Sequence, residues 1–164
     1  MGLKRRGFRF WLGVAACIIL GAIFITAGSG KLPEQSEGLV IALPAEMFLT
    51  PVLLKTIIFW LPTIEIVAGA LLVTGILARI AASGSIVLIA AFIFNNSWLT
   101  INGMAKEPCG CFGAIENSFL GYYMSTLQAL YMDIGMLILP LIILFLYPAR
   151  WFTIRPWFLG INNT

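Results

Sequence analysis

Four long apolar stretches, separated by polar segments, set the pattern of this chain. Each stretch is close to the roughly 20 residues that a helix needs to cross the hydrocarbon core of a bilayer. In that core only helices and closed barrels satisfy every backbone hydrogen bond, and stretches of this length are typical of helices. We therefore predict an all-α integral membrane protein, a four-helix bundle whose spans cover about residues 10–27, 56–78, 80–101 and 126–147.

The composition agrees with a chain that is surrounded mainly by lipid. Of its 164 residues, 60% are hydrophobic and only 10% are charged, which is more apolar surface than a soluble core of this size could bury. The predicted spans leave two longer connections, residues 28–55 and 102–125, and neither is large enough for a separate soluble module. We expect a single membrane domain over residues 1–164.

Basic residues gather on one side of the predicted bundle. Seven arginines and lysines, with no acidic residue among them, flank the first span, the turn after the second and the end of the fourth: Lys4, Arg5, Arg6, Arg9, Arg79, Arg150 and Arg155. The two longer loops instead mix lysines with glutamates. Because basic loops stay in the cytoplasm, we expect both termini there, in a bacterial inner (cytoplasmic) membrane, and both loops on the periplasmic side.

The first apolar stretch has a second interpretation, as a signal sequence that is removed. Val14–Cys17 resembles a lipoprotein cleavage box, but the residues after Cys17 stay apolar where a mature lipoprotein becomes polar. No small-x-small cleavage site follows Ala27. We therefore expect this stretch to be retained as a spanning helix.

The most reactive pattern is Cys109-Gly110-Cys111, in the second outer loop. Two thiols this close can form and exchange a disulfide, and the glycine permits the tight turn. A bridge that closes so small a ring is expected to be strained and therefore exchangeable, and the periplasm is oxidising enough to maintain it. Two alternatives remain: a static bridge or inert thiols that hold the loop, and a copper(I) site completed by Met104.

Other metal and cofactor chemistry has few ligands in this chain. There is no histidine for zinc or haem, and three cysteines are too few for an all-cysteine iron–sulfur cluster, so we expect no resident metal site of these kinds. Cys17 would lie roughly 10 Å deep from the cytoplasmic side, too far to join the outer pair. We expect it to be a packing residue.

Two carboxylates fall within the predicted spans. Glu65 and Asp133 are costly to place in hydrocarbon, and such residues are functional candidates by default. We expect both to face the bundle interior and to bond polar side chains, with Thr63, Asn95, Asn96, Ser125 and Gln128 as candidates. Glu65 is a possible proton relay between the cysteine loop and a redox carrier. The alternative is that each carboxyl group is protonated and only joins neighbouring helices.

Two longer motifs resemble a known group of membrane proteins. Ala27–Leu32 and Leu61–Gly75, the latter followed by Arg79, are similar to DoxX-like proteins, and Cys109–Gly113 resembles the cysteine motif of the MauE branch. The likeness covers roughly residues 10–147. It implies four membrane helices associated with extracytoplasmic thiol–disulfide chemistry, in which Cys109 and Cys111 would be the redox pair and Glu65 the acidic residue of the second span.

The resemblance also implies a partner. MauE is linked to maturation of a disulfide-rich dehydrogenase subunit alongside a thioredoxin-like protein. We therefore expect redox chemistry through Cys109 and Cys111 with a thioredoxin-like extracytoplasmic protein, and a quinone is the candidate acceptor of the electrons. Because the chain lacks the second outer cysteine pair of quinone-coupled disulfide enzymes, we leave open whether it is itself an enzyme.

Two other functions are compatible with the sequence. The chain could be a small accessory subunit of a larger respiratory or photosynthetic membrane complex, since it has little mass outside the bilayer. A transporter or channel that uses Glu65 is less favoured, because the spans have no internal repeat and little polar lining. Nothing in the sequence indicates a nucleic-acid partner.

Overall fold

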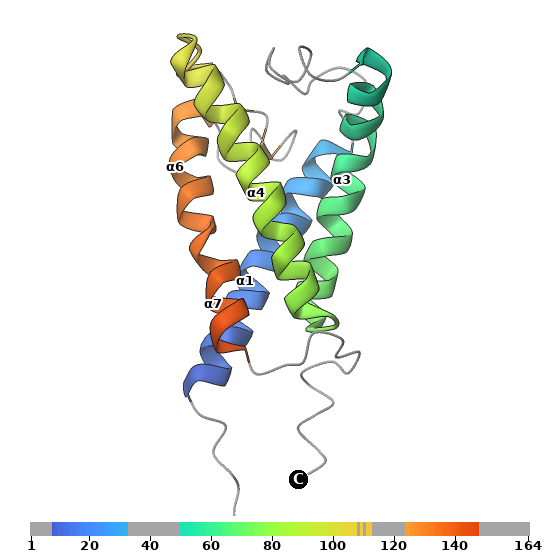
Figure 1. Ribbon diagram of the computed structural model, residues 1–164, viewed down its shortest axis with the longest axis vertical. Coiled ribbons are helices and arrows are strands. Elements are labelled where there is room, and N and C mark those ends of the chain that lie inside the picture. The colour runs from blue at the N-terminus through green and yellow to red at the C-terminus, as the bar shows by residue number, and fades with distance from the viewer. Residues whose placement is uncertain (1–7, 33–49, 108, 110, 113–123, 148–164) are drawn as a thin grey trace, which may run out of the picture.

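The computed structural model describes residues 8–32, 50–107, 109, 111–112 and 124–147. Within them the protein is all-helical, as the apolar pattern predicted. Figure 1 shows the helices as a bundle with its long axis vertical. They are α1 (Phe8–Lys31), α3 (Pro51–Thr74), α4 (Ala78–Ile101), α6 (Thr126–Met136) and α7 (Ile138–Leu146).

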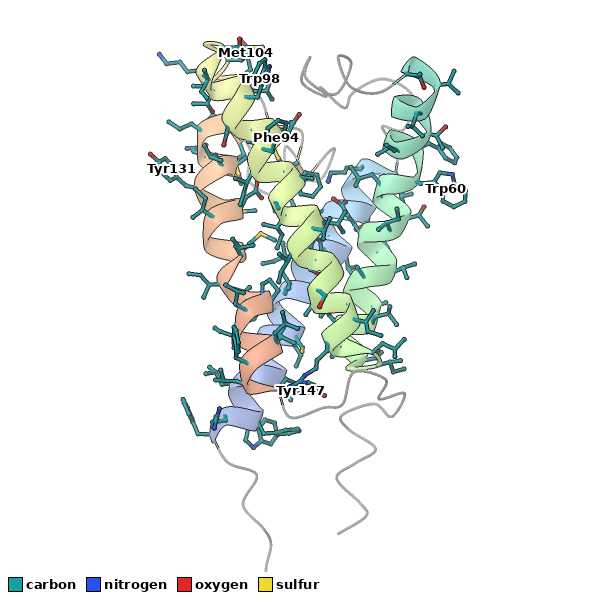
Figure 2. The ribbon with its side chains drawn as sticks, viewed as in Figure 1. Trp60, Phe94, Trp98, Met104, Tyr131 and Tyr147 are labelled. Atoms are coloured by element: carbon teal, nitrogen blue, oxygen red, sulfur yellow. A yellow bond between two sulfur atoms is a disulfide. The ribbon has the colours of Figure 1, made fainter. Side chains whose placement is uncertain are left out.

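The helices have the length and surface of membrane-spanning segments. Among the described residues, Phe8–Lys31, Ala78–Ile101 and Thr126–Leu146 are each long and apolar enough to cross a bilayer, and α3 adds the shorter apolar stretch Phe59–Thr74. Large apolar side chains cover the outside of the bundle, and Trp60 and Tyr131 project away from it (Figure 2). The chain is a multi-pass membrane protein.

The bundle is built around the pairing of α1 with α3. These two helices share the most extensive interface, while α1 also packs on α7, and α4 packs on α6, α7 and α3. A Cβ atom added to Gly69 would lie 2.6 Å from the carbonyl oxygen of Gly21, and one added to Gly21 would lie 2.7 Å from that of Gly69. Only glycine permits two helix backbones to approach so closely, which is a common device in membrane helix pairs.

The turn between the second and third spans lies earlier than the predicted spans indicated. Helix α3 ends at Thr74, because Gly75 adopts the left-handed conformation (φ 74°) that terminates a helix. Helix α4 then begins at Ala78. At the other end, α3 begins at Pro51, so that part of the expected first loop is helical; residues 33–49 of that loop lie outside the described residues.

The fourth span is two helices in sequence. Helix α6 ends at Met136 and α7 begins at Ile138. Pro140 causes the interruption, since it has no N–H to donate to the carbonyl of Met136 and its ring crowds that carbonyl.

Candidate functional site

The cysteine pair forms a disulfide in the segment between α4 and α6. Cys109 and Cys111 are bonded, with their Cα atoms 5.2 Å apart. The backbone N–H of Cys109 donates to the carbonyl of Met124 (2.9 Å). The carbonyl of Glu107 accepts from both the backbone N–H and the hydroxyl of Thr126, each at 2.9 Å. These bonds fix the disulfide against the start of α6.

The start of α6 is itself fixed by a capping box. The hydroxyl of Ser125 accepts from the backbone N–H of Gln128, and the side chain of Gln128 accepts from the backbone N–H of Ser125. This arrangement satisfies amide groups that would otherwise lack partners at the helix end. The segment that holds the cysteines therefore joins a well-defined helix N-terminus.

Asn96 connects the disulfide to a buried carboxylate. Its Nδ2 donates to Oδ2 of Asp133 (2.8 Å), and its Oδ1 lies 3.9 Å from Sγ of Cys109. Asn96 and Asp133 are 3% and 6% exposed, so the bond between α4 and α6 is shielded from solvent. Asn96 is one of the polar partners that the sequence suggested for Asp133, and that prediction is confirmed.

Glu65 has a partner that was not predicted. Nζ of Lys31 lies 2.7 Å from Oε1 of Glu65, and the two residues are 5% and 0% exposed. The ammonium also lies 4.9 Å from the centre of the Phe92 ring, a distance at which a cation is attracted to the aromatic face. Lys31, assigned from the sequence to an outer loop, is thus the buried last residue of α1.

The close approach of α1 to α3 makes this ion pair possible. A Cβ atom on Gly28 would lie 2.7 Å from the carbonyl oxygen of Pro62 and 3.2 Å from Cβ of Glu65. Gly28 lies one helical turn before Lys31, so its missing side chain leaves α1 near the position from which Glu65 projects. Oε2 of Glu65 has no hydrogen-bond partner within the described part of the chain, so the compensation that this part provides for the buried carboxylate comes from Lys31.

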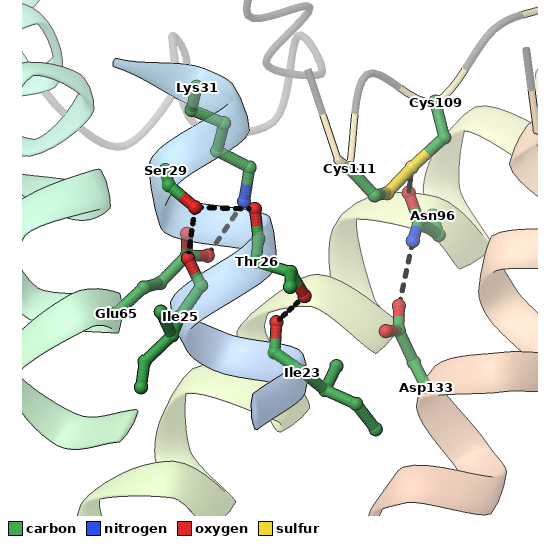
Figure 3. Close-up of polar contacts among 10 residues, drawn as sticks. All are labelled: Ile23, Ile25, Thr26, Ser29, Lys31, Glu65, Asn96, Cys109, Cys111 and Asp133. Carbon is green, nitrogen blue, oxygen red and sulfur yellow. Dashed lines mark hydrogen bonds and ion pairs between the residues drawn. A yellow bond between two sulfur atoms is a disulfide. The ribbon is translucent and has the colours of Figure 1, made fainter. Parts of the chain in front are cut away.

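A small cavity brings the charged groups and the disulfide together. Lys31, Glu65, Asp133 and Cys111 all line it, along with apolar side chains that are mainly phenylalanine and methionine. About 30 Å³ is open to the centre of a water molecule, enough space for a water or two. Figure 3 shows Lys31 and Glu65 on the left and Asn96 and Asp133 on the right, with the disulfide directly above Asn96.

The structure places the candidate residues from the sequence in two groups. Cys109, Cys111 and Glu65 all belong to this region: Glu65 is paired with Lys31, and both Glu65 and Cys111 line the cavity. Cys17 is a free thiol in the hydrophobic core, 1% exposed, as its predicted packing role requires.

Sequence reasoning missed the contribution of Lys31. The Gly28-Ser29-Gly30 segment before it resembles the end of a helix, whereas in the structure α1 continues through these residues. A signal was nevertheless present, because a carboxylate in a span needs a compensating group and Lys31 is the basic residue nearest the outer end of α1. Asn96 was named among several polar candidates, but nothing in the sequence indicated that it also faces Cys109.

Comparison with known proteins supports the family assignment. Residues 9–147 match the family described as methylamine utilisation protein MauE. No curated protein and no solved structure gives a match. The match covers every described helix almost completely, including the ion pair, the asparagine–aspartate pair and both cysteines. The chain belongs to the MauE family.

Proposed function

We propose that this protein exchanges disulfides with a thioredoxin-like partner outside the cytoplasm, through Cys109 and Cys111. The observation that carries the proposal is the bonded pair in the segment after α4, beside a cavity that holds two carboxylates and an ammonium. Charged groups within a membrane domain are expensive, and their position beside a redox-capable bond suggests a use in that chemistry. A bridge with only a structural purpose would not need them.

The proposed orientation places the disulfide on the outer side. Arg9 and Arg79 belong to the end of the bundle where α1 begins and α3 meets α4, opposite the cysteine segment (Figure 1). By the positive-inside rule, that end is cytoplasmic, and the membrane is the bacterial inner membrane.

The exchange itself is a balanced two-electron reaction. A thiolate of the partner attacks one sulfur of the pair, the Cys109–Cys111 bond breaks, and the other sulfur takes its electron pair as a thiolate. The second thiolate of the partner then attacks the mixed disulfide. The partner leaves oxidised and this chain is left with two reduced cysteines; the reverse sequence would oxidise this chain and reduce the partner.

Reoxidation of the pair requires an electron acceptor, and for this step we propose a membrane-soluble quinone. Its support is the location of Cys111 beside a largely apolar, aromatic cavity within the membrane domain. The cavity has room for a water or two, so a quinone ring would have to approach the bond by displacing neighbouring side chains.

Thiol trapping in cells tests the exchange. Cys109→Ser, Cys111→Ser and the double variant would be compared in a Cys17→Ala background, which removes the buried thiol as a source of artefacts. After acid quenching and alkylation, mixed disulfides would be identified by mass spectrometry. We expect one single variant to accumulate an adduct with a thioredoxin-like protein and the double variant to form none. Equal adduct formation by the double variant would contradict the proposal.

A further inference from the structure

The two sulfurs of the bridge have different surroundings. Cys111 lines the cavity with Lys31, while Cys109 does not, and lies instead 3.9 Å from Oδ1 of Asn96. In Figure 3 the Cys111 sulfur is on the side of the bridge that faces Lys31. A disulfide has no internal preference for which sulfur is attacked, so such asymmetry in its surroundings decides the outcome.

The orientation of the Asn96 amide is determined by its second contact. Asp133 accepts a hydrogen bond, so the amide group that faces it is the Nδ2 donor, and the oxygen is left facing Cys109. An amide oxygen can accept a hydrogen bond from a thiol but would repel a thiolate. Cys109, once reduced, is therefore stabilised as the protonated thiol.

The opposite holds for Cys111. An ammonium nearby stabilises a thiolate, and thiols with such stabilisation are the better leaving groups in exchange. Glu65 accepts from one of the three N–H donors of Lys31, and the other two N–H groups point in other directions. The Asp133 carboxylate, the other charge on the cavity, is bonded to Asn96.

We propose that Cys109 is the sulfur that the partner attacks and that Cys111 is the leaving sulfur, stabilised as a thiolate by Lys31. This inference rests on the proposed function and assigns roles within it. The incoming thiolate forms a bond to Cys109, and the electron pair of the broken bond passes to Cys111. When the partner's second thiolate resolves the mixed disulfide, Cys109 leaves as a thiolate, takes a proton from water and can then donate a hydrogen bond to Oδ1 of Asn96. Lys31 is then a positioning residue: it forms no covalent bond to either sulfur and takes no part in the electron transfer.

Glutathione is a suitable probe because it needs no knowledge of the natural partner. The oxidised Cys17→Ala protein in nanodiscs would be mixed with excess reduced glutathione, quenched with acid at short times, and fragmented by mass spectrometry across Gly110 to locate the adduct. We expect about tenfold more adduct on Cys109 than on Cys111. A majority on Cys111 would overturn the assignment but leave the proposed exchange intact, whereas no adduct on either sulfur would contradict the proposed function as well.

Charge variants then test Lys31 separately from folding. Lys31→Met/Glu65→Leu removes the cation while keeping the net charge of the pair at zero, and Glu65→Gln keeps the cation without its partner. We expect the double variant to lose the preference for Cys109 and to open the bridge about tenfold more slowly, and Glu65→Gln to keep the preference. Retention of the preference by the folded double variant would overturn the role of Lys31.

A matched control separates this effect from general loss of positive charge. Lys106 is exposed and lies three residues before Cys109 in the chain, outside the residues that line the cavity. Lys106→Met should change the opening rate and the adduct ratio less than twofold, a level we set at about the error of such measurements. An effect of Lys106→Met equal to that of the double variant would show that long-range charge, not the cavity, decides which sulfur leaves.

Discussion

Nζ of Lys31 and Oε1 of Glu65 lie 2.7 Å apart, with almost no exposure of either residue, and join α1 to α3. Each charge would be costly alone in this part of the bundle, so the two residues are best understood as one unit. The unit lies beside the only other carboxylate that the structure describes within a span, Asp133. The stability of the bundle should therefore depend on this pair and on the contacts around it, all of which can be altered without a partner protein.

Breaking the ion pair should be worse than removing it. Lys31→Met leaves an uncompensated buried carboxylate and should lower the free energy of unfolding by about 3–5 kcal/mol. Lys31→Met/Glu65→Leu removes both charges and should cost much less. Reversible unfolding in mixed micelles measures both values, and equal losses in the single and double variants would show that the two side chains are not coupled.

The Asn96–Asp133 hydrogen bond should make a modest contribution. Asn96→Leu removes the donor to Asp133 and should lower the free energy of unfolding by about 0.6 kcal/mol, the average for hydrogen bonds between membrane helices, and by no more than about 1.7 kcal/mol. Ser97→Ala, at the adjacent position of α4, is the matched control and should have little effect. A larger loss for Ser97→Ala than for Asn96→Leu would contradict this account of the α4–α6 contact.

The contact between α1 and α3 should not tolerate a side chain at its closest point. Gly69→Ala places a Cβ atom 2.6 Å from the carbonyl of Gly21, so the helices must separate, at a cost of about 1–3 kcal/mol. Gly84→Ala is the control, because a Cβ atom there would meet nothing within 4 Å. Thermal unfolding in detergent should therefore show a lower Tm for Gly69→Ala, while Gly84→Ala is unchanged or higher.

The capping box should fix the cysteine segment as well as the helix. Ser125→Ala removes the hydroxyl that accepts from Gln128 and should cost about 1 kcal/mol. Because the backbone N–H of Cys109 is hydrogen-bonded to the carbonyl of Met124, next to the cap, amide hydrogen exchange of residues 105–107 and of Cys109 should also accelerate. Thr74→Ala, whose hydroxyl bonds only carbonyls of its own helix, should leave that exchange unaffected.

The fold was largely predictable from the sequence, because the bilayer restricts which structures can span it. Apolar length alone indicates where helices lie, and Pro140 indicates where the last one is interrupted. The end of α1 was harder, since Gly28 and Gly30 are helix breakers in water yet permit close helix packing in membranes. That single misjudgement also concealed Lys31 and, with it, the partner of Glu65.

The candidate site was less predictable than the fold. Cys109 and Cys111 are recognisable by their spacing. The groups that surround each sulfur, however, come from α1, α4 and α6, which are distant from one another in the sequence. Asn96 is similar, since its two contacts lie 13 and 37 residues away in sequence. No pattern among neighbouring residues predicts contacts between positions so far apart in the sequence.

The short span of the disulfide has a final consequence. The bridge joins residues two positions apart, and a cross-link stabilises a fold chiefly by shortening the free loops of the unfolded chain, an effect that is smallest for the smallest ring. The helices around it are held by glycine contacts, an ion pair and a capping box that do not involve sulfur. Opening of this bond should therefore change the free energy of unfolding little, so we expect the reduced and the oxidised protein to share one architecture.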